Sequence, residues 1–452
     1  MRLSTNLRRG LILLLLLSVL LFAGFLWYRP LLNIGAGYAA KHACSCHFLQ
    51  GRELAEIREH DLNFSVLGIV SLSKVDNEIR SNFFGLVPRR AVFRPGVGCT
   101  LINEENKPLV AVEAGAAAGA EMNDEIADVV SGAPPLKCAL DYGMLPVAGG
   151  GARAIVVLQD SAVIAESYAP GYDASSRLLG WSMTKTLTGL IVGHHLVNHT
   201  ADTTRGRPDF AALTARNGLF PTVWTDSARR QITVNDLLQM NSGLAWNESY
   251  GALSDATIML HEHADMAGYA SAAPALRPRA SEWVYSSGTT NILAGLVDRE
   301  AGDGSFRRYC RDLFGPVAPS LLIEPSQAGL PVGSSYGWAT ARDWAKLGQL
   351  MLQDGVWNGD TLVPPGWIDW LRRPAPNAEG VYGGQLWLPG PDTPSLPEDA
   401  YMMRGFQDQR VFVVPSLSLV IARLGHNDDK TADFDGLVRR VIDALPPNGR
   451  CE

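Results

Sequence analysis

The chain has 452 residues, of which 46% are hydrophobic and 19% are charged, and its formal net charge is -7 at pH 7. This length and composition suit one large or two smaller globular domains with a proper core, and they exclude a disordered chain. Because the net charge is negative and the lysines and arginines are scattered, we exclude nucleic acid as a partner.

The N-terminus carries a candidate membrane anchor. No charged residue occurs between Arg9 and Arg29, and residues 11–27 are almost wholly Leu, Ile, Val and Phe. A helix of this length is about enough to cross a thin bilayer. We predict that residues 1–30 form an uncleaved single-pass anchor, with a cleaved signal peptide as the alternative.

The basic residues around this segment predict its orientation. Arg2, Arg8 and Arg9 precede the apolar stretch, whereas only Arg29 follows it closely. The positive-inside rule therefore places the N-terminus in the cytoplasm. We expect a protein of the inner (cytoplasmic) membrane whose remaining chain is extracytoplasmic, in the periplasm.

The cysteines fit an oxidising compartment. They are Cys44, Cys46, Cys99, Cys138, Cys310 and Cys451. They could form up to three disulfide bonds, whose pairing the sequence does not give. Cys44 and Cys46 are too close for a C-x-x-C zinc or redox motif, so we expect structural cysteines, no metal and no cofactor.

Residues 31–145 are predicted to be an N-terminal extension that packs on the catalytic body. The pattern indicates a short helix over 54–60 and a strand-like run over 64–72. This run ends in Ser71-Leu72-Ser73-Lys74, a serine and a lysine three residues apart. Because no apolar helix follows them, we reject this pair as a catalytic motif.

Residues 146–452 form the predicted catalytic body. They open with a hairpin over 154–158 and 162–168 and lead to Gly180-Trp181-Ser182-Met183-Thr184-Lys185, followed by an apolar helical run. If Ser182 lies on the first turn of that helix, Lys185 projects from the same face. A desolvated lysine can take the serine proton, and the helix N-terminus favours the charge that develops on a carbonyl oxygen during acyl transfer.

The rest of the body is mainly helical and then returns to strands. Thr233 is a good N-cap for a helix that begins at residue 234, and a further helix is predicted over 341–352. A hairpin follows over 411–424, and a helix over 434–445 closes the chain. This order predicts an α+β fold whose sheet is assembled from both ends of the body.

Three motifs in this order carry a resemblance to a known family. They are Ser182-x-x-Lys185, Tyr285-Ser286-Ser287, and Gly405-Phe406-Gln407-Asp408 before the terminal hairpin. Together they resemble the serine β-lactamase and penicillin-binding-protein fold, an antiparallel sheet flanked by helices plus a mainly helical subdomain. Within it, the chain is most similar to class C-like serine hydrolases of the 6-aminohexanoate-dimer hydrolase and carboxylesterase branch.

The resemblance implies roles for individual residues. Ser182 would be the acylated nucleophile, Lys185 its general base, and Tyr285 the phenol that passes a proton to the leaving group. The backbone N–H groups of Ser182 and Phe406 would form the oxyanion hole. Substrate-binding residues would be Trp181, Ser287, Gly405 and Gln407. We expect the ammonium of Lys185 to favour the phenolate of Tyr285.

The third motif departs from penicillin-recognising enzymes, which have Lys-Thr-Gly there. It offers no cation for a β-lactam carboxylate, and we expect Asp408 to repel one. The sequence therefore favours hydrolysis of a small ester or linear amide. A cell-wall DD-peptidase or β-lactamase, or a catalytically silent binding module on the same fold, are the alternatives. The physiological substrate and oligomeric state are not indicated.

Overall fold

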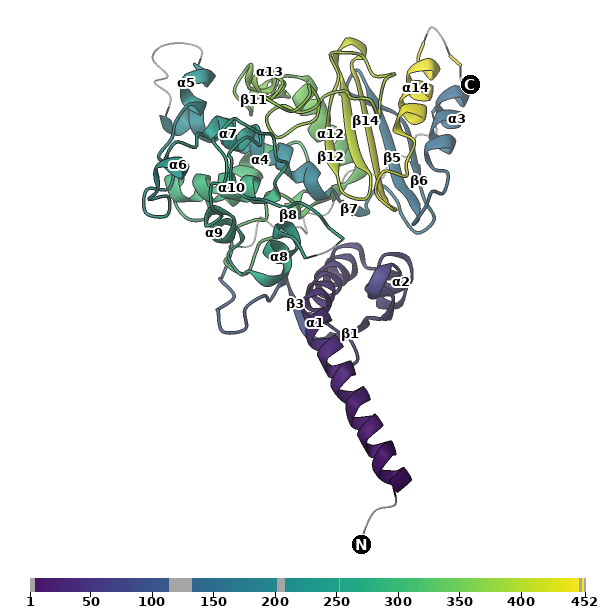
Figure 1. The fold of residues 1–452 in the computed structure, drawn as a ribbon. Helices are drawn as coiled ribbons and strands as arrows, with labels where there is room; N and C mark the ends of the chain where they lie inside the picture. The colour runs from purple at the N-terminus through teal and green to yellow at the C-terminus, as the bar shows by residue number, and fades with distance from the viewer. Residues whose placement is uncertain (1–4, 114–131, 201–207, 252, 447–448, 451–452) are drawn as a thin grey trace.

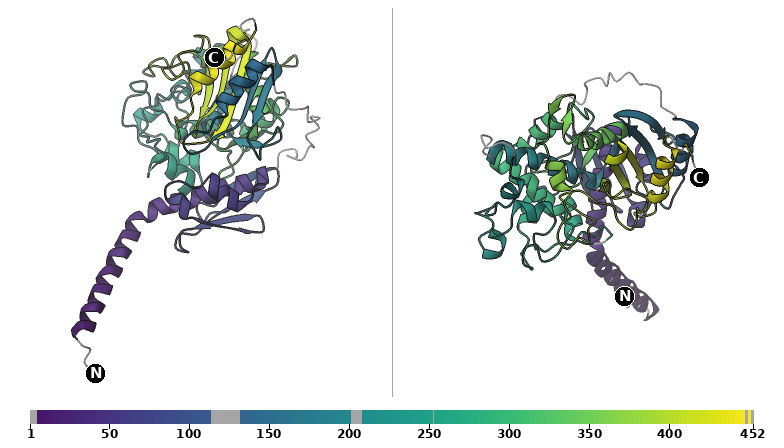
Figure 2. Two further views of the ribbon diagram at one scale, coloured as in Figure 1. Left: turned by 90° about the vertical axis from the view of Figure 1, so that its right-hand side faces the viewer. Right: turned by 90° about the horizontal axis from the view of Figure 1, so that it is seen from above.

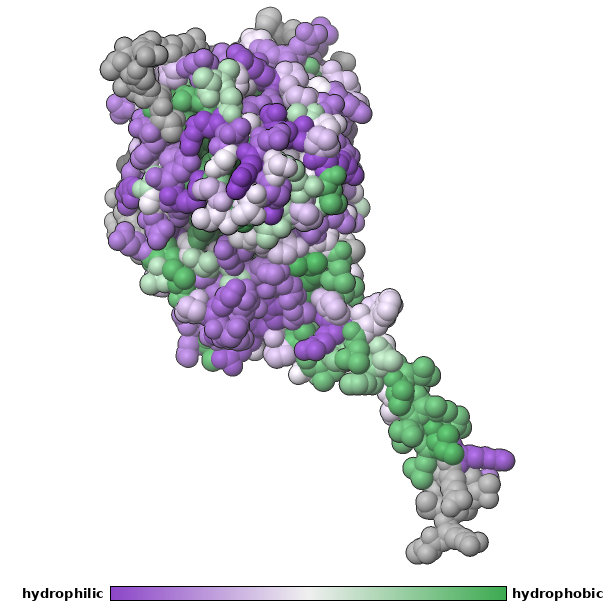
Figure 3. Space-filling model, turned by 60° about the vertical axis from the view of Figure 1, so that its left-hand side comes forward, coloured by the Kyte–Doolittle hydropathy of each residue, from purple (hydrophilic) through white to green (hydrophobic). Residues whose placement is uncertain are grey.

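The protein, a computed structural model, is described over residues 5–113, 132–200, 208–251, 253–446 and 449–450. α1 (Thr5–Gln50) is one long helix that contains Pro30. It bends where it meets the body, as expected where proline removes a helical hydrogen bond (Figures 1 and 2). Its N-terminal part is apolar and not buried, so α1 is long and apolar enough to cross a membrane (Figure 3).

The second half of α1 belongs to a small N-terminal domain. Its other elements are α2 (Leu54–His60), the 3₁₀ helix η1 (Ser65–Ile69), and the antiparallel strands β1 (Ser71–Val75), β2 (Glu78–Asn82), β3 (Arg89–Arg94) and β4 (Gly98–Leu101). The sheet packs along α1, and small residues such as Ala36, Ala39, Ala40 and Ala43 let the two approach closely. A disulfide bond joins Cys44 of α1 to Cys99 of β4.

The remaining cysteines differ in whether they form disulfide bonds. Cys138 is disulfide-bonded, and Cys451 lies outside the described residues. Of the described cysteines, Cys46 and Cys310 carry free thiols.

The predicted helix over 54–60 is confirmed, but the strand-like prediction over 64–72 is wrong in its first part. Ser65 has φ 51°, and residues 65–69 form η1, which turns Leu67 into the core before β1 begins. Ser71 and Lys74 of the rejected motif are exposed on β1. Strand alternation sends their side chains to opposite faces, so they cannot act together.

The catalytic body is built on an antiparallel sheet. Its strands are β5 (Gly151–Gln159), β6 (Ala162–Tyr168), β12 (Tyr401–Gly405), β13 (Gln409–Val414) and β14 (Leu419–His426), in the order β12-β13-β14-β5-β6. β14 pairs with β5, with Ala422 opposite Val156. The prediction that both ends of the body build one sheet is confirmed.

Helices cover both faces of this sheet (Figure 1). On one face, α3 (Pro134–Gly143) and α14 (Phe434–Ala444) pack against side chains such as Phe412. On the other, α12 (Ala341–Leu352) packs against Val411 and Val413, as strand alternation requires. α12 lies close to the strands because a Cβ at Gly348 would stand 2.8 Å from Val411.

The helical part lies beside the sheet and contains the predicted nucleophile. It comprises η2 (Trp181–Met183), α4 (Thr184–Thr200), α5 (Phe210–Thr214), α6 (Ser227–Arg230), α7 (Val234–Leu238), α8 (Asp255–Glu262), α9 (Met266–Ser271), α10 (Ser287–Ala301), α11 (Ser305–Phe314) and α13 (Trp367–Leu371). The small strands β7 (Arg177–Leu179), β8 (Leu322–Ile323) and β9 (Gly337–Thr340) form a second sheet, and β10 (Val356–Trp357) pairs with β11 (Asp360–Thr361). Thr233 caps α7 through a capping box with Asp236, as predicted.

The N-terminal domain is joined to the body by buried polar contacts. Lys41 of α1 forms an ion pair with Glu324, which is fully buried. Ser45 Oγ and Trp338 Nε1 also donate to this carboxylate, over 2.9 and 2.8 Å. Loss of one partner of such a deeply buried ion pair strongly destabilises the folded protein, because the other charge stays buried without compensation. The pair therefore favours one arrangement of the N-terminal domain and the body.

Candidate active site

Ser182 lies in η2, between β7 and the start of α4. The sequence predicted it on the first turn of the helix; it stands instead on the 3₁₀ turn directly before α4. The three-residue spacing still brings Lys185 to the same face, with Nζ 2.9 Å from Ser182 Oγ. Trp181 has φ 47°, a left-handed conformation that is costly for a tryptophan and must be held by its surroundings.

Lys185 is enclosed, with 1% of its surface exposed. Its Nζ donates to Ser287 Oγ over 2.9 Å and to the Ser334 carbonyl over 3.1 Å. Burial lowers the pKa of Lys185 to about 8, while Glu248, whose Oε1 is 4.0 Å from Nζ, acts in the opposite direction. A lysine with this pKa is partly neutral near pH 8, as a general base for the Ser182 hydroxyl must be.

Glu248 is a member of this cluster that the sequence did not reveal. It accepts hydrogen bonds from the Ser287 backbone N–H over 2.8 Å, from Ser287 Oγ, and from Tyr250 Oη over 2.9 Å. Ser287 therefore bridges Lys185 and Glu248 inside the body and is fully buried. Glu248 and Tyr250 lie in a loop without a recognisable motif, so only the folded chain identifies them.

Tyr285 is half-buried beside Ser182, and Lys185 Nζ stands 4.8 Å from the centre of its ring. Burial, with a smaller contribution from Glu248, raises the pKa of Tyr285, and a hydrogen bond to Ser182 offsets this in part. These surroundings favour the neutral phenol over the phenolate that the sequence led us to expect, and a phenol is suited to donating a proton.

The end of β12 lies against η2. A Cβ at Gly405 would stand 2.1 Å from the Gly180 carbonyl oxygen, so only glycine fits this approach. The Phe406 ring meets the Trp181 ring edge to face, 5.8 Å between centroids, and stacks on Tyr250 at 5.0 Å. The structure therefore brings Gly405 and Phe406 beside Ser182.

Charges around the third motif differ from the expectation. Asp408 is fully buried and accepts hydrogen bonds from the backbone N–H groups of residues 430, 431 and 432. It shapes the loop and does not face a substrate, so its predicted repulsion of a carboxylate is wrong. The sequence did not indicate a role for Arg404 of β12. Its charge lowers the pKa of Tyr285, and its guanidinium lies 4.4 Å from the Trp387 ring centre and 3.2 Å from Asp392.

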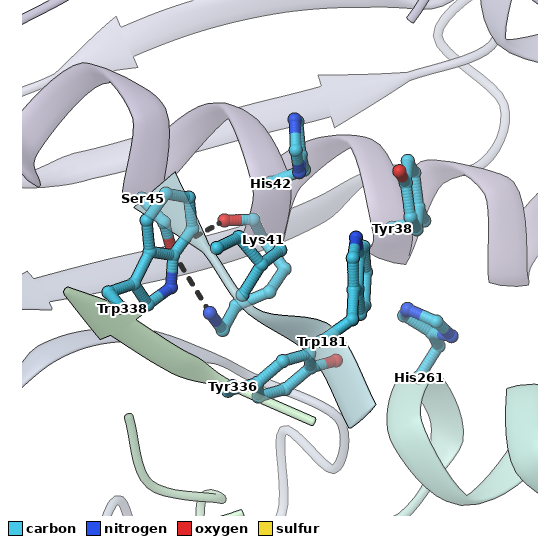
Figure 4. Close-up of a pocket in the computed structure, with 9 residues that line it drawn as sticks. Tyr38, Lys41, His42, Ser45, Trp181, His261, Tyr336 and Trp338 are labelled. Carbon is cyan, nitrogen blue, oxygen red and sulfur yellow. Dashed lines mark hydrogen bonds between the residues drawn. The ribbon is translucent and has the colours of Figure 1, made fainter. Parts of the chain in front are cut away.

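Trp181, predicted to bind substrate, is buried against α1. Its ring stacks on Tyr38, 6.1 Å between centroids, and its Nε1 donates to Gln407 Oε1 over 3.1 Å. Figure 4 shows Tyr38, Trp181 and Tyr336 around a small cavity of about 10 Å³, room for about one water molecule. Gln407 and Tyr38 of α1 thus hold the Trp181 ring, the side chain directly before Ser182.

A second buried cluster contains residue types that could bind a metal ion. Ligand atoms of His42, Asp61 and His426 lie within 4.8 Å of one another. Asp61, however, forms ion pairs with Arg52, with Arg153 and with His42. Burial opposes protonation of His42, but Cys46 and Asp61 raise its pKa to about 9. Several positive groups thus already share one carboxylate, which fits a domain-joining ion-pair cluster better than a cation site.

Comparisons with known proteins find relatives in sequence and in fold. The 6-aminohexanoate-dimer hydrolase of Paenarthrobacter ureafaciens is 26% identical over 331 residues, which cover 65% of this chain and 79% of that protein. A Bacillus anthracis protein described as a 6-aminohexanoate-dimer hydrolase has a TM-score of 0.55 at 18% identity, over 69% of this chain and 83% of that one. A family VIII carboxylesterase has a TM-score of 0.51 at 14% identity, over 69% and 97%.

At 18% and 14% sequence identity, the two solved structures show that the chain shares their fold, the β-lactamase/transpeptidase-like fold. A family model described as Beta-lactamase matches residues 149–445, well over half of the chain. The matched region begins at the first strand of the sheet and ends with the terminal helix. The chain therefore belongs to the beta-lactamase family.

Proposed function

We propose that this protein is a serine hydrolase that cleaves small esters or linear amides through an acyl-enzyme on Ser182. The observation that carries the proposal is the 2.9 Å contact between Ser182 Oγ and Lys185 Nζ, with a Lys185 pKa of about 8. A fully charged lysine could donate to the hydroxyl but could not accept its proton. The lowered pKa supplies the neutral amine that activation requires.

Acylation follows from these protonation states. Lys185 takes the Ser182 hydroxyl proton as Oγ bonds to the carbonyl carbon. Tyr285 gives its proton to the leaving alcohol or amine as the bond to that group breaks, and the ammonium proton then restores the phenol. In deacylation, the same groups deprotonate a water molecule and return a proton to Ser182, which releases the acid.

The developing oxyanion needs donors near Ser182. We assign this role to the backbone N–H groups of Ser182 and Phe406, because the close packing of Gly405 on Gly180 carries Phe406 to the nucleophile. Substrate contacts are assigned to Gly405 and Phe406. Trp181, Ser287 and Gln407 act behind them, because their side chains are already engaged within the protein.

The surroundings of Tyr285 support an uncharged substrate with apolar groups. Trp387 lies 5.3 Å from its ring centre, Tyr382 5.8 Å and Trp283 6.2 Å. Tyr382 is buried, but the partly exposed rings of Trp283 and Trp387 favour short acyl or alkyl groups. The relative from Paenarthrobacter ureafaciens is named as a hydrolase of a 6-aminohexanoate dimer, which fits a proposed substrate of this class.

A cell-wall DD-peptidase or β-lactamase is the second candidate, and Arg404 favours it as a cation for a substrate carboxylate. This guanidinium is already paired with Asp392 and stacked on Trp387, which leaves it less available than a free lysine. We therefore rank this function second. A silent binding module is opposed by the close contact of serine and lysine.

We also propose that α1 is an uncleaved anchor and that the body is extracytoplasmic. The support is the exposed apolar window of α1 and the way in which the same helix continues into the domain core. The Cys44–Cys99 disulfide is consistent with an oxidising compartment. A cleaved signal would pass the same test of length and composition. Membrane fractionation and protease treatment of spheroplasts test this: a soluble mature form that begins near residue 40 would refute it.

The nucleophile is tested by labelling the full-length protein with a fluorophosphonate and mapping the adduct by peptide mass spectrometry. Label on Ser182, lost in Ser182→Ala, is the expected result. Lys185→Arg should fold but lose turnover, because arginine keeps the charge and does not give up its proton near neutral pH. Near-normal activity in that variant would remove Lys185 from the mechanism.

The substrate class is tested with p-nitrophenyl acetate and butyrate against nitrocefin and penicillin. Short esters need little beyond the nucleophile and the oxyanion hole, so they should turn over, and the β-lactams should be poor substrates. Efficient nitrocefin hydrolysis without esterase activity would instead favour the second candidate, and Arg404→Met would then show whether Arg404 is responsible.

A further inference from the structure

An apolar rim lies on the N-terminal domain where α1 leaves it. The rim consists of Ile69, Phe84 and Leu86, whose side chains are 58%, 79% and 60% exposed. Ile69 ends η1, and the other two lie in the turn between β2 and β3. These segments are neighbours, because Ser71 pairs with Asn82 at the adjoining ends of β1 and β2. Large apolar side chains grouped on a surface indicate a contact with something apolar.

The rim is close to the apolar part of α1. A Cβ at Gly35 would stand 3.4 Å from both Leu67 of η1 and Phe83 of the turn, which fixes both segments against the helix at that level. Phe25, which lies within the apolar stretch of α1, also packs against the core of this domain. The domain thus reaches down to the part of α1 that the proposed anchor places in or beside the bilayer.

The geometry of α1 agrees with this position. Along a helix, the seven steps from Tyr28 to Gly35 rise about 10 Å, and the bend of α1, which contains Pro30, brings Gly35 closer to the membrane than a straight helix would. Figure 3 shows apolar surface on α1 and again where it joins the body, and Figure 2 shows the N-terminal sheet on the side from which the anchor descends. Tryptophan and tyrosine at positions 27 and 28 are residues typical of the membrane interface.

We propose that Ile69, Phe84 and Leu86 insert into the interfacial region of the bilayer and seat the N-terminal domain on the membrane. This inference rests on the proposal that α1 is the anchor. The occupant is the lipid surface rather than a second copy of the chain, because the rim continues the apolar surface of α1. The seat, together with the buried contacts to the body, sets one orientation of the active site relative to the membrane.

The test measures the depth of single positions in the full-length protein. The fluorophore NBD is attached to Phe84→Cys and Leu86→Cys, each in a Cys310→Ser background, and the proteins are reconstituted in phosphatidylcholine vesicles with or without doxyl-labelled lipid. The matched control is Asp76→Cys. Asp76 and Phe84 both have φ 54° in turns of the same domain, and they flank opposite ends of β2.

Asp76 lies at the end of the domain that is distant from the rim. Its neighbour Lys74 stands 5.1 Å from the ring centre of Phe48, near the end of α1. We expect blue-shifted emission and at least about twofold stronger doxyl quenching at positions 84 and 86 than at 76, as for side chains at the acyl boundary. Equal, weak quenching at all three positions would overturn the proposal.

Flotation of the same vesicles separates this failure from failure of the anchor. Protein that does not float would refute both proposals. Protein that floats but carries unquenched labels would refute only the proposed insertion of the rim. A blue shift that depends on protein concentration and not on doxyl lipid would mean that a second copy covers the rim, which also overturns it. Circular dichroism spectra that match the spectrum of the unlabelled protein verify that the labelled proteins are folded.

Discussion

Glu248→Gln should shift the pH dependence of catalysis to lower pH, because the carboxylate lies 4.0 Å from Lys185 Nζ and raises the pKa of that lysine. Two unit charges at this distance interact by about 1 kcal/mol in water and about 4 kcal/mol in a medium typical of a protein surface. This corresponds to about 0.8–3 pKa units. Glutamine keeps the shape and most of the hydrogen bonds, so the loss is mainly of charge.

The assay is kcat/KM for p-nitrophenyl butyrate across pH 6–10, which reports the free enzyme. In the wild-type enzyme, activity should rise with a midpoint near the Lys185 pKa of about 8, because the neutral amine is the active form. In Glu248→Gln the midpoint should fall to about 7 or below, so the neutral fraction at pH 7 would rise roughly fivefold. The plateau at high pH should be equal or lower, since a weaker base accepts the proton less well.

The control is Glu59→Gln, an exposed glutamate of α2, which should leave the midpoint unchanged. A midpoint in Glu248→Gln that is equal to the wild-type value, or higher, would refute the electrostatic coupling. Loss of all activity with a normal fold would mean that catalysis requires the Glu248 carboxylate itself. Its effect on the pKa of Lys185 would then not explain its role.

Three further changes probe the site and its support. Tyr285→Phe should lower kcat by about 10²–10⁴, since only the proton-donating hydroxyl is removed, and a loss under about threefold would indicate packing alone. Gly405→Ala should lower stability by about 1–3 kcal/mol and abolish turnover, because the new methyl group would collide with the Gly180 carbonyl; wild-type kinetics would contradict this. Lys41→Met should cost about 3–5 kcal/mol in chemical denaturation, because it leaves the Glu324 carboxylate buried without its cation, and a neutral result would show that the pair is dispensable.

Two of these changes have matched controls. Gly251→Ala adds its methyl group where the described protein has nothing within 4 Å, so it should be neutral. Lys137→Met removes a lysine whose pair with Asp141 is 60% and 59% exposed, and such surface pairs are worth under about 1 kcal/mol.

Local spacing in the sequence was enough to predict the elements and the order of the motifs. A serine and a lysine three residues apart before an apolar helical run face the same side, even though Ser182 stands on the 3₁₀ turn before α4. The alternating segments at both ends of the body indicate strands of one sheet. Residues 65–69 were misread because an apolar run of that length fits a strand or a buried turn equally well, and packing of Leu67 against α1 decided between them.

The protonation states could not be predicted in this way, because a pKa depends on burial and on charges that are distant in sequence. Glu248 is 63 residues from Lys185, and Arg404 is 119 residues from Tyr285, yet each affects its partner's pKa. Asp408 was expected to face a substrate, but the backbone N–H groups of residues 430–432 enclose it. The sequence by itself determined which residues can perform the chemistry; the tertiary structure decided which of them are neutral, charged or buried, since electrostatic free energies depend on distance and solvent exposure.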